Sequence, residues 1–160
     1  MKILVTYYSR TGNTKKIANA IANELKCDIE EIFDVKGRKG PLGYLRSSKE
    51  AMRKMLVKIK PIKKDPSKYD LVVIGTPVWG WNMSSPIRTY ISNNKFKKVA
   101  FFCTMSCSGA KKIFKDMEEL CKSKPVAQLQ LIATEVKSGR FSDKIKKFIA
   151  SIKQVNSVTP

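Results

Sequence analysis

Three hydroxyl side chains and one glycine stand close together near the start of the chain, in the run Ser9-Arg10-Thr11-Gly12-Asn13-Thr14. The run follows an apolar segment, residues 3–7, and precedes residues 14–26, where isoleucine and leucine recur every four positions. This spacing predicts a strand followed by a helix. Backbone N–H groups at a helix N-terminus bind anions, and hydroxyls donate further hydrogen bonds. The loop therefore predicts a phosphate site, and the alternative is an ordinary capped turn.

Two common nucleotide-binding motifs do not match this loop. It lacks the glycine-lysine-serine ending of a Walker A loop. With Gly12 as its only glycine, it also lacks the repeated glycines of the dinucleotide fingerprint. Gly12 still lets the backbone turn closely around an anion. The phosphate prediction therefore depends on the hydroxyls and on the helix N-terminus.

A second loop follows the apolar run 71–74 and reads Thr76-Pro77-Val78-Trp79-Gly80-Trp81-Asn82-Met83-Ser84. A tryptophan in a loop beside a strand end exposes an aromatic face that can stack on a flat ring. Either tryptophan could instead fold back onto the core, and for Trp81 this second interpretation competes closely.

A third loop follows the apolar run 99–103 and reads Thr104-Met105-Ser106-Cys107-Ser108-Gly109. Its small polar residues would let backbone groups approach the edge of a ligand. Cys103 and Cys107 straddle the strand end, where a redox-active dithiol is conceivable. The more ordinary interpretation is a buried, small apolar side chain at Cys103 and an incidental thiol at Cys107.

The composition excludes several classes of site. The chain of 160 residues contains no histidine, so a Ser-His-Asp hydrolase and a histidine-based zinc site are excluded. No apolar run reaches the roughly 18 residues that a membrane span needs, and the N-terminal segment does not resemble an export signal. We therefore expect a cytoplasmic protein whose four cysteines are reduced.

The charge balance is strongly basic, with 32 lysine and arginine residues, 13 acidic residues and a net charge of +19. Basic residues scattered along the whole chain favour a solvated surface, and an acidic partner or substrate is the functional alternative. A module that binds nucleic acid or an anionic membrane surface would carry the same charge. The sequence contains no recognised nucleic-acid motif and no isolated basic tail, so a specific nucleic-acid partner is not expected.

Strands and helices alternate along the whole chain. Short apolar runs predict five strands, at 3–7, 29–33, 71–74, 99–103 and within 126–136. An additional helix is predicted at 44–56, with Met52, Met55 and Leu56 on one side, after a glycine-rich loop at 36–43. Alternating strands and helices form a parallel sheet covered on both faces. We expect a three-layer α/β sandwich in a single domain, residues 1–160, that binds ligands beyond the carboxyl ends of its strands.

The three loops resemble those of the flavodoxin family. The Ser-x-Thr-Gly-x-Thr pattern of residues 9–14 is similar to the family's FMN phosphate loop, and Thr-Pro-Val-Trp at 76–79 resembles its first flavin loop. The third loop occupies the position of the family's second flavin loop. The order of elements matches from Met1 to about Lys153. The resemblance implies a short-chain, flavodoxin-like fold with sheet order 2-1-3-4-5 and one noncovalently bound FMN.

The resemblance also implies which residues contact the cofactor. The phosphate group would be held by Ser9, Arg10, Thr11, Gly12, Asn13 and Thr14. One side of the flavin ring would be lined by Thr76, Pro77, Val78, Trp79 and Gly80, and the other side by Ser106, Cys107, Ser108 and Gly109. No catalytic side chain and no metal is implied, because the flavin supplies the chemistry.

Electron transfer with a redox partner protein is the function that the resemblance implies. The alternative is an FMN-dependent reductase that takes hydride from NAD(P)H and reduces a quinone or a similar acceptor. That enzyme would need open space over the ring and a nicotinamide site, and no second nucleotide motif is present. Classical flavodoxins are acidic and many place a tyrosine in the third loop, whereas this chain is basic and has none between Cys103 and Gly109. These departures argue against classical partners rather than against FMN.

Overall fold

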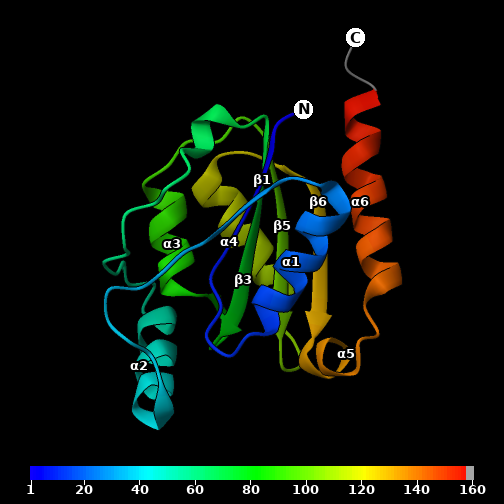
Figure 1. The fold of residues 1–160 in the computed structure, drawn as a ribbon. Coiled ribbons are helices and arrows are strands. Elements are labelled where there is room, and N and C mark those ends of the chain that lie inside the picture. The colour runs from blue at the N-terminus through cyan, green and yellow to red at the C-terminus, as the bar shows by residue number, and fades with distance from the viewer. Residues whose placement is uncertain (158–160) are drawn as a thin grey trace.

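A parallel sheet lies at the centre of the computed structural model, which describes residues 1–157 (Figure 1). Residues 158–160, the end of the expected domain, lie outside the described residues. The sheet order is β2-β1-β3-β5-β6, with the two-residue strand β4 (Asn82–Met83) paired antiparallel to β3. Counted without β4, this order confirms the expected 2-1-3-4-5. The five parallel strands are β1 (Ile3–Tyr7), β2 (Asp28–Glu31), β3 (Leu71–Trp79), β5 (Val99–Met105) and β6 (Pro125–Ile132).

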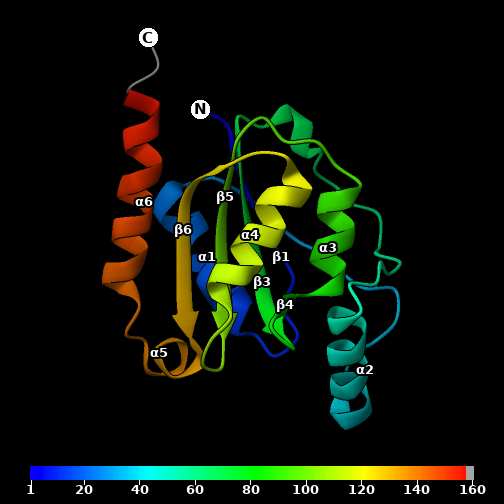
Figure 2. The ribbon, with the colours of Figure 1, turned by 180° about the vertical axis from the view of Figure 1, so that it is seen from behind.

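Two long helices cover each face of the sheet. On one face lie α1 (Asn13–Leu25) and α6 (Ser142–Ser157), and on the other lie α3 (Ser85–Ser92) and α4 (Ala110–Cys121), as the two opposite views show (Figures 1 and 2). The expected three-layer α/β sandwich is therefore confirmed. Among the described residues, no helix is both long enough and apolar enough to cross a membrane.

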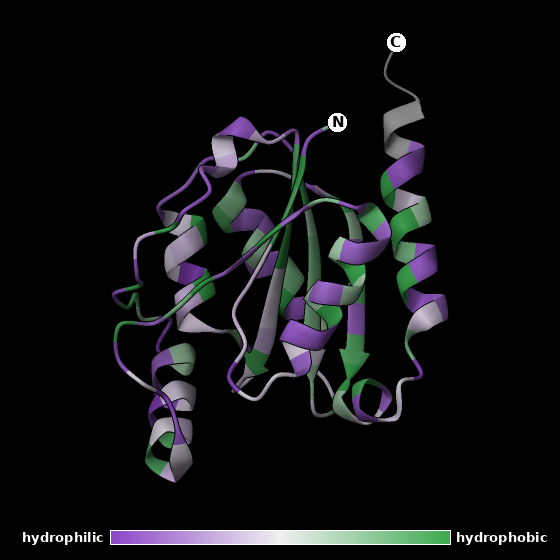
Figure 3. Ribbon diagram, in the orientation of Figure 1, coloured by the Kyte–Doolittle hydropathy of each residue, from purple (hydrophilic) through white to green (hydrophobic). Residues whose placement is uncertain are grey.

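The central strands are apolar along their length because helices cover both of their faces. In β3, Val72 and Ile74 belong to the core cluster under α3 and α4, whereas Leu71 and Val73 belong to the cluster under α1 and α6. Each fully buried side chain of this size stabilises the fold by about 1.5–3 kcal/mol. Helix α6 meets the sheet with one side only, and its residues accordingly alternate between hydrophobic and hydrophilic in Figure 3.

The segment after residue 74, predicted as a loop, is a strand that continues into a hairpin. Strand β3 runs on to Trp79 and pairs with β4 through Val78 and Trp79. The two residues between the strands, Gly80 and Trp81, have φ angles of 52° and 56°. Positive φ at both central positions defines a type I′ turn, whose twist matches that of the strands it joins. The loop prediction is wrong here because the periodicity of a short strand end is hidden beside proline and glycine.

Helix α2 (Gly40–Met52) begins and ends four residues earlier than the predicted helix at 44–56. Gly40 and Pro41, predicted as part of a loop, form its first turn, where proline fits because its missing N–H would be unpaired anyway. Met52, Met55 and Leu56, the expected apolar side, are all exposed. The side that α2 buries consists instead of small and polar residues, namely Gly43, Ser47, Glu50 and Ala51.

Two shorter elements complete the fold. A single 3-10 turn, η1 (Pro66–Lys68), precedes β3 and is capped by the side chain of Asp65. The last strand was expected within 126–136, but β6 ends at Ile132 and α5 (Ala133–Ser138) follows at once. The carboxylate of Glu135 accepts a hydrogen bond from the Ile132 N–H at 3.0 Å and so fixes the start of α5.

Candidate functional site

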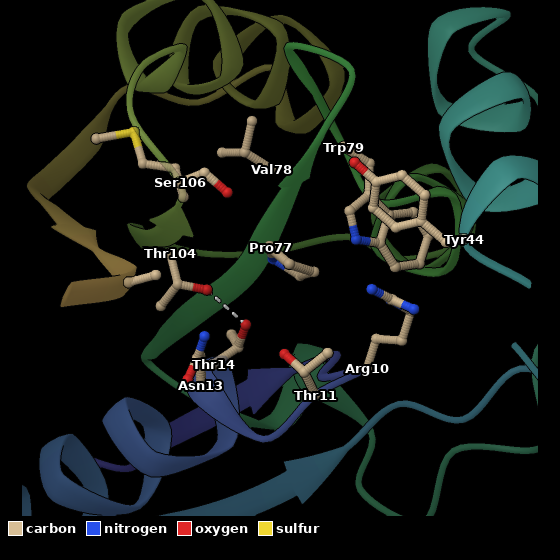
Figure 4. Close-up of a pocket in the computed structure, with 12 residues that line it drawn as sticks. Arg10, Thr11, Asn13, Thr14, Tyr44, Pro77, Val78, Trp79, Thr104 and Ser106 are labelled. Carbon is tan, nitrogen blue, oxygen red and sulfur yellow. Dashed lines mark hydrogen bonds between the residues drawn. The ribbon is translucent and has the colours of Figure 1, made fainter. Parts of the chain in front are cut away.

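A pocket of about 130 Å³ lies at the carboxyl ends of β1, β3 and β5. This is the edge at which parallel sheets bind their ligands. Residues from all three chemically suggestive segments line it, together with residues of α2 and of the α5 N-terminus (Figure 4). The lining residues are Arg10, Thr11, Asn13, Thr14, Tyr44, Pro77, Val78, Trp79, Thr104, Met105, Ser106 and Ala133.

The loop at residues 9–14 turns tightly onto the N-terminus of α1. Gly12 is the N-cap residue, with a φ of 96°, and no side chain caps this helix end. The Gly12 N–H donates to the Ser9 hydroxyl at 3.1 Å, so Ser9 closes the loop. The first turn of α1 contains no acidic residue. Because the helix dipole is positive at this end, the loop favours an anion.

The two threonines of this loop have different environments. Thr11 is exposed and lines the pocket. Thr14 is buried, and its hydroxyl shares a 2.8 Å hydrogen bond with the hydroxyl of Thr104 on β5. In Figure 4 this bond joins the start of α1 to the end of β5. The Thr14 hydroxyl is therefore a structural link between two walls of the pocket, whereas the Thr11 hydroxyl is available to a ligand.

The second wall comes from the end of β3. Pro77, Val78 and Trp79 line the pocket. Trp79, which the sequence suggested as an exposed stacking face, is only 6% exposed and meets Tyr8 edge to face at 5.3 Å between ring centroids. Burial raises the pKa of the Tyr8 hydroxyl to about 12. Trp81, for which a core position competed closely, is the exposed tryptophan. The two differ because Trp79 lies in a strand that α2 covers and Trp81 lies in the hairpin turn.

Tyr44 on α2 lines the pocket from the side opposite β5 and was not anticipated from the sequence. The guanidinium of Arg10 lies over its ring, 5.1 Å from the centroid, and Figure 4 shows both side chains beside Trp79. Such a cation–π contact contributes about 0.5–1 kcal/mol at an exposed site. The contact connects α2 to the loop at residues 9–14. No local pattern signals this, because Tyr44 reaches the pocket only through the packing of α2.

A buried network of charges holds α2 against the sheet. Arg38 is almost fully buried and its guanidinium contacts Asp34, Ser47 and Glu50, with Nη2 2.6 Å from Glu50 Oε2. The same guanidinium lies 5.4 Å from the Trp79 ring centroid. Burial acts to raise the pKa of the Glu50 carboxyl, but hydrogen bonds from Arg46 and Arg38 outweigh it and the pKa is lowered. Glu50 is therefore held as a carboxylate.

The third wall begins two residues earlier than the expected Ser106, at Thr104, and ends sooner. Met105 and Ser106 line the pocket after Thr104, whereas Cys107, Ser108 and Gly109 lie outside it. The Trp81 indole N–H donates to the Ser108 hydroxyl at 3.4 Å, so this part of the loop contacts the hairpin turn. Gly109 has a φ of 116° and is the N-cap residue of α4.

Four other expected site residues do not line the pocket, and one of them, Gly12, is the N-cap residue of α1. Ser9 closes its loop, and Thr76 accepts a hydrogen bond from the Ser84 N–H at 2.9 Å, which ties β3 to the start of α3. Gly80 forms the hairpin turn and packs under Met52 of α2. The other three positions shape the walls rather than face a ligand.

The cysteines and the acidic side chains form neither a disulfide nor a metal site among the described residues. Cys103 is fully buried, and burial raises the pKa of its thiol to about 12, whereas Cys107 is exposed. All four cysteines are free. Across the part of the chain that the structure describes, no group of three or more cysteine or acidic side chains is arranged to hold a metal ion.

Comparison with known proteins agrees with this geometry. A flavoprotein from Lactobacillus acidophilus in complex with FMN is 28% identical, with a TM-score of 0.69 over 86% of this chain and 97% of its own. A protein from Bacteroides uniformis shares the fold at 23% identity and a TM-score of 0.78, over 93% of this chain and 97% of its own. Oxidised flavodoxin 2 from Bacillus cereus shares the fold at 18% identity and a TM-score of 0.59, over 96% of this chain and 99% of its own. No curated protein sequence matches. The flavodoxin profile matches residues 2–151, and the chain therefore belongs to the flavodoxin family.

Proposed function

We propose that this chain binds one FMN without a covalent bond and uses it to pass electrons to and from a redox partner protein. Membership of the flavodoxin family supports the proposal, as does the FMN in the Lactobacillus acidophilus flavoprotein. The observation that carries it is the pocket itself. A hydroxyl-bearing loop at an open helix N-terminus and the ends of β3 and β5 converge on one cavity at the sheet edge.

The loop at residues 9–14 fits a phosphate group. A Cβ at Gly12 would have no atom within 4 Å, so space for a ligand lies directly beside the turn. The uncapped helix end leaves backbone N–H groups for an anion. We propose that Thr11, Asn13 and the backbone around Gly12 hold the phosphate, with Arg10 adding positive charge. In this arrangement Ser9 and Thr14 keep the loop in shape.

The flavin ring would lie against β3. Pro77, Val78 and Trp79 would line one side of it, and Met105 and Ser106 would line the other. When bound, FMN supplies the one- and two-electron chemistry, while the protein binds, orients and surrounds it. No side chain of the pocket is needed as a general acid or base, which accords with a chain that lacks histidine.

The position of Trp81 favours a carrier over an NAD(P)H-dependent reductase. A reductase would need open space beside the flavin for a nicotinamide. Trp81 contacts Ser108, and a Cβ on Gly109 would lie 3.3 Å from its indole ring. The hairpin turn therefore occupies part of the surface next to the third wall.

The net charge of the chain suggests the kind of partner, and its free cysteines suggest where the protein is located. A net charge of +19 would attract an acidic partner over long distances, and salt would weaken the attraction. Four free cysteines are typical of a reducing compartment, so we place the protein in the cytoplasm.

The proposal is tested by comparing FMN with riboflavin. Apoprotein should bind FMN well and riboflavin much more weakly, because the phosphate contacts supply much of the affinity. Titration of each flavin, followed through the quenching of its fluorescence, measures both affinities. Equal affinity for the two flavins would contradict the phosphate assignment. Steady-state oxidation of NADPH by the loaded protein would instead support the reductase.

A further inference from the structure

Exposed large apolar side chains of the described residues concentrate in one part of the molecule. Apart from Met1, they all belong to residues 33–35, to residues 42–56 or to Trp81. Leu42 is 82% exposed, Leu45 64% and Met52 63%. Soluble proteins rarely leave a concentrated apolar surface uncovered unless it binds something.

We call four of these side chains, Leu42, Leu45, Met52 and Trp81, the α2 face. The three α2 residues follow the i, i+3, i+10 spacing of one helix side. A Cβ on Gly80 would lie 2.7 Å from the Met52 side chain, so Met52 packs on the turn that carries Trp81. In both views α2 stands outside the sheet layers, at the end where the strands finish (Figures 1 and 2).

The surroundings of the α2 face are basic. Residues 36–60 contain nine lysine and arginine residues and one acidic residue, Glu50. Glu50 is buried and paired with Arg38 and Arg46, so it does not offset the surface charge. Lys49 and Arg53 are exposed on the same side of α2 as these apolar residues, and within the described residues neither forms an ion pair. An apolar centre with a charged rim is the arrangement of a protein–protein interface.

The α2 face lies on elements that also reach the candidate cofactor pocket or its third wall. Tyr44, on the same helix, lines the pocket, and Trp81 contacts Ser108 beside the third wall. A protein seated on this face would therefore lie next to the pocket opening. The surface and the cofactor site are parts of one region of the molecule.

We propose that the α2 face is the docking site of an acidic electron-carrier protein. This inference rests on the proposed function, which makes the partner an electron carrier. The basic residues Lys49 and Arg53 are the reason for expecting the partner to be acidic. An acidic protein would pair with Lys49 and Arg53 while its apolar centre covers Leu42 and Leu45. Complementary charges of this kind accelerate association and select the partner.

Two other occupants fit the surface less well. In a twofold dimer the same patch faces itself, so Lys49 and Arg53 of each copy would face those of the other. With +19 on each chain, this arrangement is repulsive. Nucleic acid would be attracted to the rim, but its phosphates gain nothing from exposed leucine side chains.

Three double variants of the FMN-loaded protein test the proposal, with a small acidic ferredoxin as the probe and calorimetry as the readout. Lys49→Glu with Arg53→Glu should weaken binding at least about tenfold. Lys146→Glu with Lys147→Glu, exposed on α6, changes the net charge equally and should weaken it no more than about twofold, because salt screens distant charges. Leu42→Gln with Leu45→Gln leaves the charge at +19 and should weaken binding about tenfold.

Each other outcome overturns the proposal. Equal losses of ferredoxin affinity in the two charge variants would mean that the attraction depends on the net charge of the protein and not on the α2 face. Failure of the unaltered protein to bind the ferredoxin would exclude the acidic carrier. Sedimentation of the unaltered protein as a dimer that the leucine variant abolishes would assign the face to a second copy. Tight binding of duplex DNA, lost in the Lys49 and Arg53 variant alone, would assign it to nucleic acid.

FMN content separates this inference from the proposed function. The absorbance of the bound flavin and its bleaching by dithionite are measured for every variant. If all variants load and bleach normally while the ferredoxin results fail, only the docking inference falls. If the unaltered protein does not bind FMN, the proposed function falls first. Circular dichroism verifies that the exposed substitutions leave the fold intact.

Discussion

Two walls of the pocket are held in place by different forces. The loop at residues 9–14 is fixed by neutral hydrogen bonds, from Gly12 to Ser9 and between Thr14 and Thr104. Helix α2 is fixed by buried charges, with the Arg38 guanidinium among Asp34, Ser47 and Glu50. Breaking a buried ion pair by removing one partner is costly, whereas a single neutral hydrogen bond contributes modestly. The two walls should therefore respond differently to mutation and to pH.

The largest expected effect is the loss of Arg38. Arg38→Met keeps the apolar stem but leaves the Asp34 carboxylate buried beside no cation and the Glu50 carboxylate with Arg46 alone. We expect the free energy of unfolding to fall by about 3–5 kcal/mol, the cost of an uncompensated buried charge. Urea denaturation followed by circular dichroism measures this.

A surface ion pair provides the control for Arg38. Lys97 lies 3.6 Å from Asp70, and both side chains are about half exposed. Lys97→Met should change the free energy of unfolding by less than about 1 kcal/mol. Similar losses in the two variants would show that the charges around Arg38 are solvated and that α2 is held in some other way.

The next largest effects separate the two threonines of the loop. Thr14→Val leaves the buried Thr104 hydroxyl without its partner, so the free energy of unfolding should fall by about 1–3 kcal/mol. Thr11→Val removes an exposed hydroxyl and should leave stability unchanged, but weaken FMN binding by about 1–3 kcal/mol. Denaturation of the apoprotein and FMN titration are measured for both variants. If Thr14→Val instead weakened FMN binding and Thr11→Val instead lowered stability, Thr14 and not Thr11 would face the phosphate.

A smaller effect is expected from Gly12→Ala. The φ of 96° is strained for alanine, and a Cβ there meets no atom, so the cost is backbone strain of about 1–2 kcal/mol. Gly139 is the matched control, because it has a φ of 76° and equally open surroundings but lies at the end of α5 and not in the loop at residues 9–14. Both alanine variants should lose stability, and only Gly12→Ala should also lose affinity for FMN.

The same contrast explains what could be predicted from the sequence. The alternation of strands and helices and the loop at residues 9–14 were predictable because periodicity, hydroxyls and a helix start are local signals, whereas the strand order came from the resemblance to the flavodoxin family. Tyr44 and Ala133 were not, because tertiary packing alone brings them to the pocket. Nor do neighbouring residues reveal that Trp79 is buried and Trp81 exposed, since this depends on whether β3 ends before or after position 79.

Buried charge is the other feature that local patterns do not reveal. Arg38 stands in a basic, glycine-rich stretch that is typical of an exposed loop. It is buried because Gly43 lets α2 approach closely, since a Cβ at that position would overlap the Arg38 backbone carbon. The start of α2 and the burial of Arg38 thus depend on the same close packing. The prediction of a loop at 36–43 included neither.

The smallest expected effect is the dependence of the α2 wall on pH. Hydrogen bonds from Arg46 and Arg38 lower the pKa of Glu50 despite its burial, so the unfolded chain takes up this proton at a higher pH than the folded chain does. The stabilisation by the carboxylate is therefore fully present above the ordinary pKa of 4.5 and is lost as the pH falls through the lower, folded value. Glu50→Gln should be less stable than the unaltered protein at pH 7. The difference should shrink as the pH falls below 4.5, because protonation of Glu50 removes the same charge. Glu24→Gln, at an exposed position on α1, is the control for the loss of one surface carboxylate. Urea denaturation at a series of pH values measures these differences, and a Glu50→Gln difference that stays constant into acid would show that the α2 wall depends on the shape of this side chain and not on its charge.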